Sequence, residues 1–296
     1  MKKGNIRIAA FILLSLIWAP AFGGSKILLS TIGPISLAAI RFWIAAILLT
    51  IVRFVIPQKC GKRLRKEDWK LLLLTSIACV LHYVFSNYAS LLLNETESSM
   101  ISSFQAVFTL LASGLLLENL VTPKISFCVG ISSIGAVLTM EFGLLRENVL
   151  RGYALMIAAI VVWVLYCIYV PKLLQNSSCF WVVYAQCLIS AVMLTPAFIF
   201  EPVPIQSIGG LQWAVLLFLG ILGIAVGFLL NAYGLKQMGP IRVSLVLNGI
   251  PIVLLLINML FQNKEITPVR LLGSIMILLG TILAILDYAK KDQQPI

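Results

Sequence analysis

The chain has 296 residues, of which 60% are hydrophobic and only 11% are charged, and its mean hydropathy is +1.03. Soluble domains average about 45–50% apolar and about 25% charged residues, so this composition excludes a soluble globular enzyme, a disordered chain and a disulfide-bonded scaffold. The net charge of +11, in so apolar a protein, indicates basic cytoplasmic loops rather than nucleic-acid binding. We therefore expect an integral membrane protein that is surrounded by the lipid bilayer.

A transmembrane helix needs about 20 mostly apolar residues, and ten segments of the chain approach that requirement. The gaps between them leave no room for a soluble domain, so the sequence predicts an all-α membrane protein of ten transmembrane helices. In chain order the predicted helices are Ile6–Lys26, Pro34–Ile56, Trp69–Leu92, Ser98–Leu117, Pro123–Met140, Tyr153–Leu173, Phe180–Phe200, Leu211–Lys236, Ile241–Phe261 and Pro268–Tyr288.

The basic residues predict how these helices are oriented. With the N-terminus inside, 16 Lys and Arg residues fall on the cytoplasmic side and four fall outside, while Lys26 and Arg41 lie in or near the first two helices. The loop Pro57–Asp68 holds the largest cytoplasmic group. Since basic residues concentrate in cytoplasmic loops, we expect a multi-pass protein of the cell (inner or plasma) membrane with both termini in the cytoplasm.

The two halves of the chain match at a separation near 145 residues, which indicates an internal repeat. Two repeats of five helices each, residues 1–147 and 148–296, would be inverted relative to each other because five is odd. Inverted repeats recur among transporters, whose substrate binds between the two halves near the midplane. The matching residues are Trp18 and Trp163, Trp69 and Trp213, Asn87 and Asn231, Glu118 and Glu265, and the pair Gly130 and Gly135 with Gly273 and Gly280.

The first two predicted helices resemble the opening of an EamA domain of the drug/metabolite transporter superfamily. That domain runs from a Trp-containing first helix to a Lys, then a Pro, then an Arg in the second helix. Here the corresponding residues are Trp18, Lys26, Pro34 and Arg41. Gln186, at the position of Arg41 in the second half, is not basic.

The fourth helix of each half resembles the same family, whose pattern there is Pro-Val-Phe followed by Glu. In the first half, Gln105 stands in place of the Pro and the helix ends at Glu118. In the second half the Pro is present as Pro251, and Glu265 lies one residue later than the pattern places it. The resemblance covers essentially the whole chain. It implies ten helices, a cavity lined mainly by helices 1, 3, 4, 6, 8 and 9, and small metabolites, amino acids or drugs as substrates.

Polar side chains inside these helices should face the bundle interior or a hydrated cavity, because an unpaired polar group in hydrocarbon costs several kcal/mol. They recur at helical spacing in the third, fourth and ninth predicted helices, while aromatic residues dominate the first and sixth. Small polar residues can also pack helices together, and the tryptophans can be interface anchors. The residues that we predict to bind substrate are Trp18, Phe22, His82, Ser86, Asn87, Ser102, Gln105, Thr109, Trp163, Tyr166, Ser244 and Asn248.

Charged residues near the helices are interpreted first as structural. Arg41 lies about two turns into its helix, where it can pair with backbone carbonyls or attract an anionic group, and Lys26 can snorkel to the interface. We interpret Glu118 and Glu265 as caps or bridges between helices. None of the 11 acidic residues is placed mid-membrane, so proton coupling would have to use His82, the sole histidine. We expect facilitated diffusion or exchange rather than obligate proton symport.

The sequence contains no motif for catalysis or metal binding. It lacks His-Glu-x-x-His and Gly-x-Ser-x-Gly, and its six cysteines form no Cys-x-x-Cys pair. We expect no catalytic residue, no metal, no cofactor and no nucleic-acid partner, and a monomer or weak dimer. The favoured function is a secondary transporter that moves a small metabolite by alternating access, with an amino acid or related amphipathic solute, moved outward, as the favoured substrate. The alternative is a non-transporting receptor or scaffold.

Overall fold

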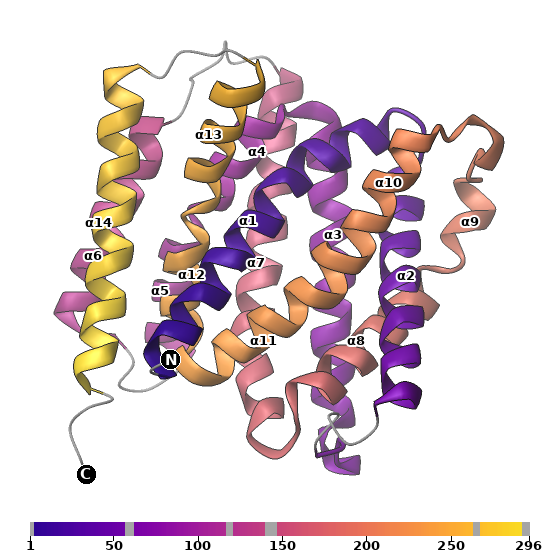
Figure 1. The fold of residues 1–296 in the computed structure, drawn as a ribbon, viewed down its shortest axis with the longest axis horizontal. Helices are drawn as coiled ribbons and strands as arrows, with labels where there is room; N and C mark the ends of the chain where they lie inside the picture. The colour runs from indigo at the N-terminus through magenta and orange to yellow at the C-terminus, as the bar shows by residue number, and fades with distance from the viewer. Residues whose placement is uncertain (1–2, 57–61, 117–120, 140–146, 263–266, 292–296) are drawn as a thin grey trace.

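The computed structural model describes residues 3–56, 62–116, 121–139, 147–262 and 267–291, and its regular structure there is entirely helical. Helices occupy all ten predicted apolar segments (Figure 1). Within the described residues, seven continuous helical segments are long and apolar enough to cross a membrane. Shorter apolar helices cover Leu13–Leu29, Pro123–Leu138 and Pro268–Ala284. The prediction of an all-helical membrane protein is therefore confirmed, while ten membrane spans remain a prediction.

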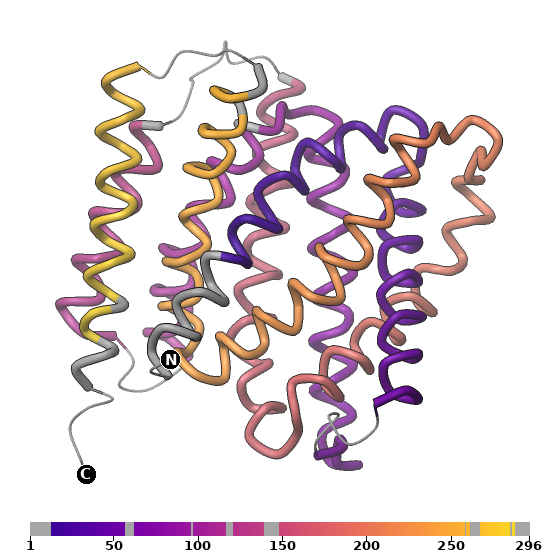
Figure 2. Tube along the Cα trace, in the orientation of Figure 1, coloured from indigo at the N-terminus to yellow at the C-terminus, as the bar shows by residue number. Residues whose placement is uncertain are grey.

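Figure 2 traces the chain through these helices. Two short 3-10 turns, η2 (Lys66–Asp68) and η3 (Ile205–Ser207), and one π-helical segment, η4 (Leu219–Val226), accompany the α-helices. The α-helices are α1 (Lys3–Leu29), α2 (Pro34–Val55), α3 (Trp69–Leu92), α4 (Glu95–Ser102), α5 (Gln105–Leu116), α6 (Pro123–Thr139), α7 (Glu147–Asn176), α8 (Cys179–Leu194), α9 (Ala197–Phe200), α10 (Gly210–Phe218), α11 (Gly227–Met238), α12 (Pro240–Leu247), α13 (Ile250–Gln262) and α14 (Pro268–Lys291).

Two of the apolar segments are broken at positions 145 residues apart. The α4–α5 break lies at residues 103–104 and the α12–α13 break at 248–249. Pro251 in the first turn of α13 has no N–H to donate and excludes a continuous helix. In α4 the hydroxyls of Ser102 and Ser103 bond the carbonyls of Ser98 and Ser99 at 2.8 and 3.4 Å, a pattern that bends helices.

The α6 and α14 helices pack in close antiparallel contact at one edge of the bundle (Figure 1). A Cβ atom on Gly135 would lie 2.5 Å from the Gly273 carbonyl oxygen, and one on Gly280 would lie 2.5 Å from the Cys128 carbonyl oxygen. Gly280 follows Gly135 by 145 residues, and Gly273 follows Cys128 by the same number. The two contacts are therefore reciprocal, as a two-fold relation between the halves would produce.

The N-terminus of α2 is capped by an acidic residue from a distant part of the chain. Oε2 of Glu201, at the C-terminal end of α9, accepts from the backbone N–H groups of Ile35 and Ser36 at 2.8 and 2.9 Å. The Ser36 hydroxyl donates to the Glu201 carbonyl oxygen at 2.7 Å. A carboxylate satisfies two of the free N–H groups there and complements the positive end of the helix.

Replacing Glu201 with alanine is expected to destabilise the protein by about 0.5–2 kcal/mol, because two helix-terminal N–H groups lose their acceptor. The measurement is the melting temperature of the purified protein in detergent. Glu201→Gln retains an acceptor oxygen and should lose less. If Glu201→Ala melts at the temperature of the unsubstituted protein, the cap does not stabilise α2.

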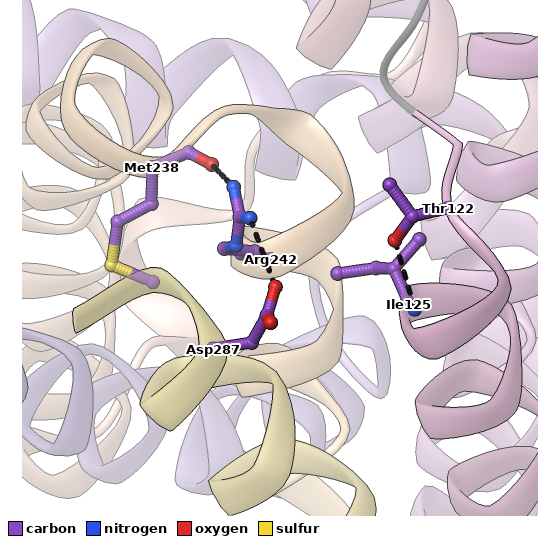
Figure 3. Close-up of polar contacts among 5 residues, drawn as sticks. All are labelled: Thr122, Ile125, Met238, Arg242 and Asp287. Carbon is purple, nitrogen blue, oxygen red and sulfur yellow. Dashed lines mark hydrogen bonds and ion pairs between the residues drawn. The ribbon is translucent and has the colours of Figure 1, made fainter. Parts of the chain in front are cut away.

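Charged side chains also form hydrogen bonds and an ion pair between the ends of neighbouring helices. The Lys26 ammonium at the end of α1 donates to the Leu93 carbonyl just beyond α3. At the end of the bundle where α14 finishes, the Arg242 guanidinium of α12 donates to the Met238 carbonyl at 3.3 Å and lies 3.9 Å from the Asp287 carboxylate of α14 (Figure 3). The predicted roles of Glu118 and Glu265 fall outside the described residues.

Candidate functional site

A cavity of about 90 Å³ lies inside the bundle, where both broken helices meet α1, α2, α3 and α7. Its wall combines aromatic and aliphatic side chains with hydroxyls, amides and one guanidinium, and the described residues of the wall include no Asp or Glu. Such a lining suits a solute with an apolar part and a few hydrogen-bonding groups. The lining residues are Trp18, Ala21, Phe22, Ser25, Arg41, His82, Tyr83, Ser86, Asn87, Ser90, Ser102, Gln105, Trp163, Leu247 and Ile250.

Eight of the twelve residues that we predicted to bind substrate meet at this cavity, and they come from five helices. Helical spacing brings the α3 residues onto one face. Helical spacing of polar residues explains α1 and α7 less well, because bulky aromatic residues of these two helices reach the cavity. The eight are Trp18, Phe22, His82, Ser86, Asn87, Ser102, Gln105 and Trp163.

The other four predicted residues lie outside the cavity lining. Thr109 and Ser244 return their hydroxyls to their own helices, to the carbonyls of Gln105 at 2.7 Å and Ile241 at 2.8 Å. Tyr166 donates to Gln186 at 3.3 Å, and the amide nitrogen of Asn248 donates to the Ser132 hydroxyl at 2.8 Å. These hydrogen bonds lie within the protein, as helix packing would also produce, although Oδ1 of Asn248 has no partner.

The two tryptophans matched by the repeat meet across the bundle. The rings of Trp18 and Trp163 lie 5.8 Å apart, edge to face, and Trp163 stacks on Tyr166 at 4.6 Å. Phe228 of α11 contacts both tryptophans, at 6.5 and 5.7 Å. Edge-to-face and offset arrangements are the favourable ones for aromatic rings, so this cluster forms a rigid apolar wall.

The π-helical segment η4 makes room for groups from α1 and α2. The Trp18 indole nitrogen donates to the Gly223 carbonyl at 2.9 Å, and a Cβ atom on Gly223 would lie 3.8 Å from Nη2 of Arg41. A Cβ atom on Gly220 would lie 2.6 Å from Ile44 of α2. π-Helical segments are frequent at functional sites, and this one lies in contact with Trp18 and close to Arg41, which both line the cavity.

The polar side chains of α3 are anchored on neighbouring helices. Nδ1 of His82 lies 3.0 Å from the Ala159 carbonyl of α7, and the imidazole lies 4.8 Å from the Trp163 ring. The Asn87 amide donates to the Pro34 carbonyl at the start of α2, at 2.7 Å. Both side chains therefore hold α3 against its neighbours as well as lining the cavity.

Seven lining residues were not among those that we predicted to bind substrate. Tyr83 and Ser90 lie on α3 with the predicted residues, Arg41 was interpreted as structural, and the other four had no predicted role: Ala21, Ser25, Leu247 and Ile250. The repeat could have found two of them, because Leu247 and Ile250 follow the predicted Ser102 and Gln105 by 145 residues. Ala21 and Ser25 carry no such signal, since one small side chain in an apolar helix looks like ordinary helix packing.

The fold and the cavity together define a helical membrane protein with a cavity inside its bundle. A sequence profile of the EamA-like transporter family matches residues 5–141 and 150–286. The chain belongs to the EamA-like transporter family and is a membrane transporter of that family rather than an enzyme. The resemblance inferred from the sequence is thus confirmed.

Similar proteins agree with this assignment. An uncharacterized transporter of Archaeoglobus fulgidus is 26% identical over 90% of this chain and 94% of its own length. The uncharacterized transporter YyaM of Bacillus subtilis is 23% identical, and the match covers 100% of both chains. One solved crystal structure matches 98% of this chain and 99% of its own with a TM-score of 0.75 and 16% sequence identity, which shows a common fold.

Proposed function

We propose that the protein is a secondary transporter that carries a small amphipathic metabolite, an amino acid or a related solute, outward across the cell membrane. The observation that carries this proposal is the cavity where both broken helices meet. Interrupted helices at the midplane are typical of transporter binding sites, and the cavity presents both aromatic faces and hydrogen-bonding groups.

The proposal includes alternating access between two inverted repeats, residues 1–147 and 148–296. The antiparallel contact of α6 with α14 supports it, because corresponding helices run in opposite directions when repeats are inverted. The cavity of about 90 Å³ is smaller than the roughly 150 Å³ cavity that holds benzene. We propose that this conformation is contracted and widens toward one side when solute enters.

The orientation also belongs to the proposal. The helix α1 begins, and α14 ends, on the same side of the bundle (Figure 1). The excess of Lys and Arg on that side supports cytoplasmic termini. Transport by exchange or facilitated diffusion fits a cavity whose only imidazole, on His82, is already engaged with a carbonyl.

Counterflow in proteoliposomes tests this function. Vesicles that contain the purified full chain are loaded with one unlabelled amino acid and then given the same labelled amino acid outside, across a panel of amino acids. We expect transient accumulation of label for at least one of them, and collapse of an imposed pH gradient should leave the rate unchanged. If folded protein gives no flux of any member of the panel, the non-transporting receptor or scaffold becomes the better explanation.

A further inference from the structure

Arg41 places an unneutralised positive charge at the central cavity. Its side chain is only 4% exposed, and Nη1 donates to the Ser25 hydroxyl at 3.2 Å. The guanidinium carbon lies 4.8 Å from the centre of the Tyr83 ring, while Nε has no hydrogen-bond partner. No Asp or Glu in the described part of the chain forms an ion pair with Arg41. A hydroxyl and an aromatic ring are its partners.

Such a charge is expensive in the interior of a membrane protein. A buried ion is tolerated when an opposite charge and hydrogen bonds replace its hydration, and removing the partner of a buried pair is strongly destabilising. The Ser25 hydroxyl already donates to the Ala21 carbonyl at 2.7 Å, so it offers Arg41 only a neutral acceptor. The missing negative charge can come from a solute in the cavity.

A second donor at the same cavity also lacks a partner. Gln105 begins α5 at the break in the helix and is 7% exposed, and its Nε2 has no hydrogen-bond partner. A buried amide N–H without an acceptor carries a desolvation cost. Arg41 and Gln105 both line this cavity, and each has a buried N–H group without a hydrogen-bond partner. A carboxylate has enough lone pairs to accept from both.

The rest of the wall disfavours a cation. The described lining residues include no acidic side chain, so an ammonium group with no carboxylate beside it would meet the Arg41 charge in a small space of low dielectric constant. Like charges in such a setting repel strongly. Trp18, Trp163 and Leu247 of the same lining provide an apolar surface.

We propose that the cavity selects solutes that carry a carboxylate, which Arg41 and Gln105 bind while the tryptophans and Leu247 contact the apolar part of the solute. This inference rests on the proposed transport function and narrows its substrate class to carboxylates and zwitterions. Amines without a carboxylate are excluded from the site by the charge of Arg41.

The first test compares matched solutes on the unsubstituted full chain in detergent. The probes are two series, alanine with propionate and ethylamine, and leucine with isocaproate and isoamylamine, together with inorganic phosphate. A ligand that binds the folded state raises the melting temperature by an amount that grows with the ratio of ligand concentration to Kd. We expect a shift from carboxylate-bearing members and none from the amines or phosphate. The proposal is overturned if an amine or phosphate acts as well as the carboxylates, or if no carboxylate acts.

The second test uses variants of the two donors. Arg41→Gln should weaken carboxylate binding about 10- to 100-fold, the range for a hydrogen bond to a charged group, and should reduce discrimination against the amines. Arg41→Lys retains the charge and should retain part of the discrimination. The matched control is Arg53→Gln on the same helix, because Arg53 lies over the Trp181 ring, away from the cavity lining, and should bind as the unsubstituted protein does.

Gln105→Leu separates ligand binding from a structural role. Removing an unpaired buried amide should leave the ligand-free melting temperature equal or higher, while the shift produced by the carboxylates becomes smaller. A lower ligand-free melting temperature with an unchanged carboxylate shift would remove Gln105 from the site. Counterflow that continues without a preference for carboxylates would remove this inference alone, whereas absence of all counterflow would remove the transport function.

Discussion

Replacing Gly280 with alanine is expected to destabilise the protein by roughly 1–3 kcal/mol, as overpacking of a close-packed interface does. The new Cβ atom would lie 2.5 Å from the Cys128 carbonyl oxygen and 2.9 Å from Cβ of Ser132, both on α6. The first neighbour is a backbone atom, so the clash is relieved only if α14 moves away from α6. The melting temperature in detergent measures the loss.

Two further glycines provide the comparison. Gly135→Ala should cost a similar amount, because its Cβ atom would meet the Gly273 carbonyl oxygen at 2.5 Å in the reciprocal contact. Gly130→Ala on the same α6 helix is the control, since nothing lies within 4 Å of its Cβ position, and alanine favours a helix by up to about 1 kcal/mol. Equal melting temperatures for the three variants would show that the α6–α14 contact is not close-packed in solution.

The sequence predicted the helical elements well because length and apolarity are local properties. It could not predict the internal breaks, which depend on where a few side chains compete with the backbone. Pro251 marks one break directly, but the α4–α5 break has no such mark, because the bonds from the Ser102 and Ser103 hydroxyls to preceding carbonyls also occur in unbroken helices. The π-helical segment η4 likewise has no signal in its apolar sequence.

The residues of the candidate site could likewise be predicted only in part. Spacing along α3 and α4–α5 identified one polar face, yet Thr109 has the same chemistry and spacing as Ser102 and lies outside the cavity lining. Both hydroxyls bond the preceding turn of their own helix, so neither polarity nor this bond distinguishes a cavity from a packed interface. For Arg41 the error was the opposite one, because the sequence indicated a structural role and the side chain lines the cavity. Its neighbours Ser25 and Tyr83 are distant in the sequence.

Trp163→Ala is expected to abolish counterflow and to destabilise the protein by about 3–5 kcal/mol, the range for removing a large buried aromatic side chain. Trp163 is 3% exposed, and its ring contacts those of Trp18, His82 and Tyr166. Removing it eliminates one wall of the cavity and leaves these three rings and that of Phe228 without their common neighbour. Melting temperature in detergent and counterflow in proteoliposomes measure the two effects separately.

Two companion variants test whether the effect of Trp163→Ala comes from loss of the cavity wall or from loss of any aromatic side chain. Trp163→Phe retains a ring against Trp18 and Tyr166 and should recover most of the stability and part of the transport. Trp213→Ala is the matched control, because Trp213 is 41% exposed on α10 and is absent from the cavity lining, so it should melt and transport nearly as the unsubstituted protein does. Full transport by a folded Trp163→Ala protein would mean that solute crosses the bundle without contacting the tryptophan pair, and the binding site would then have to be sought elsewhere.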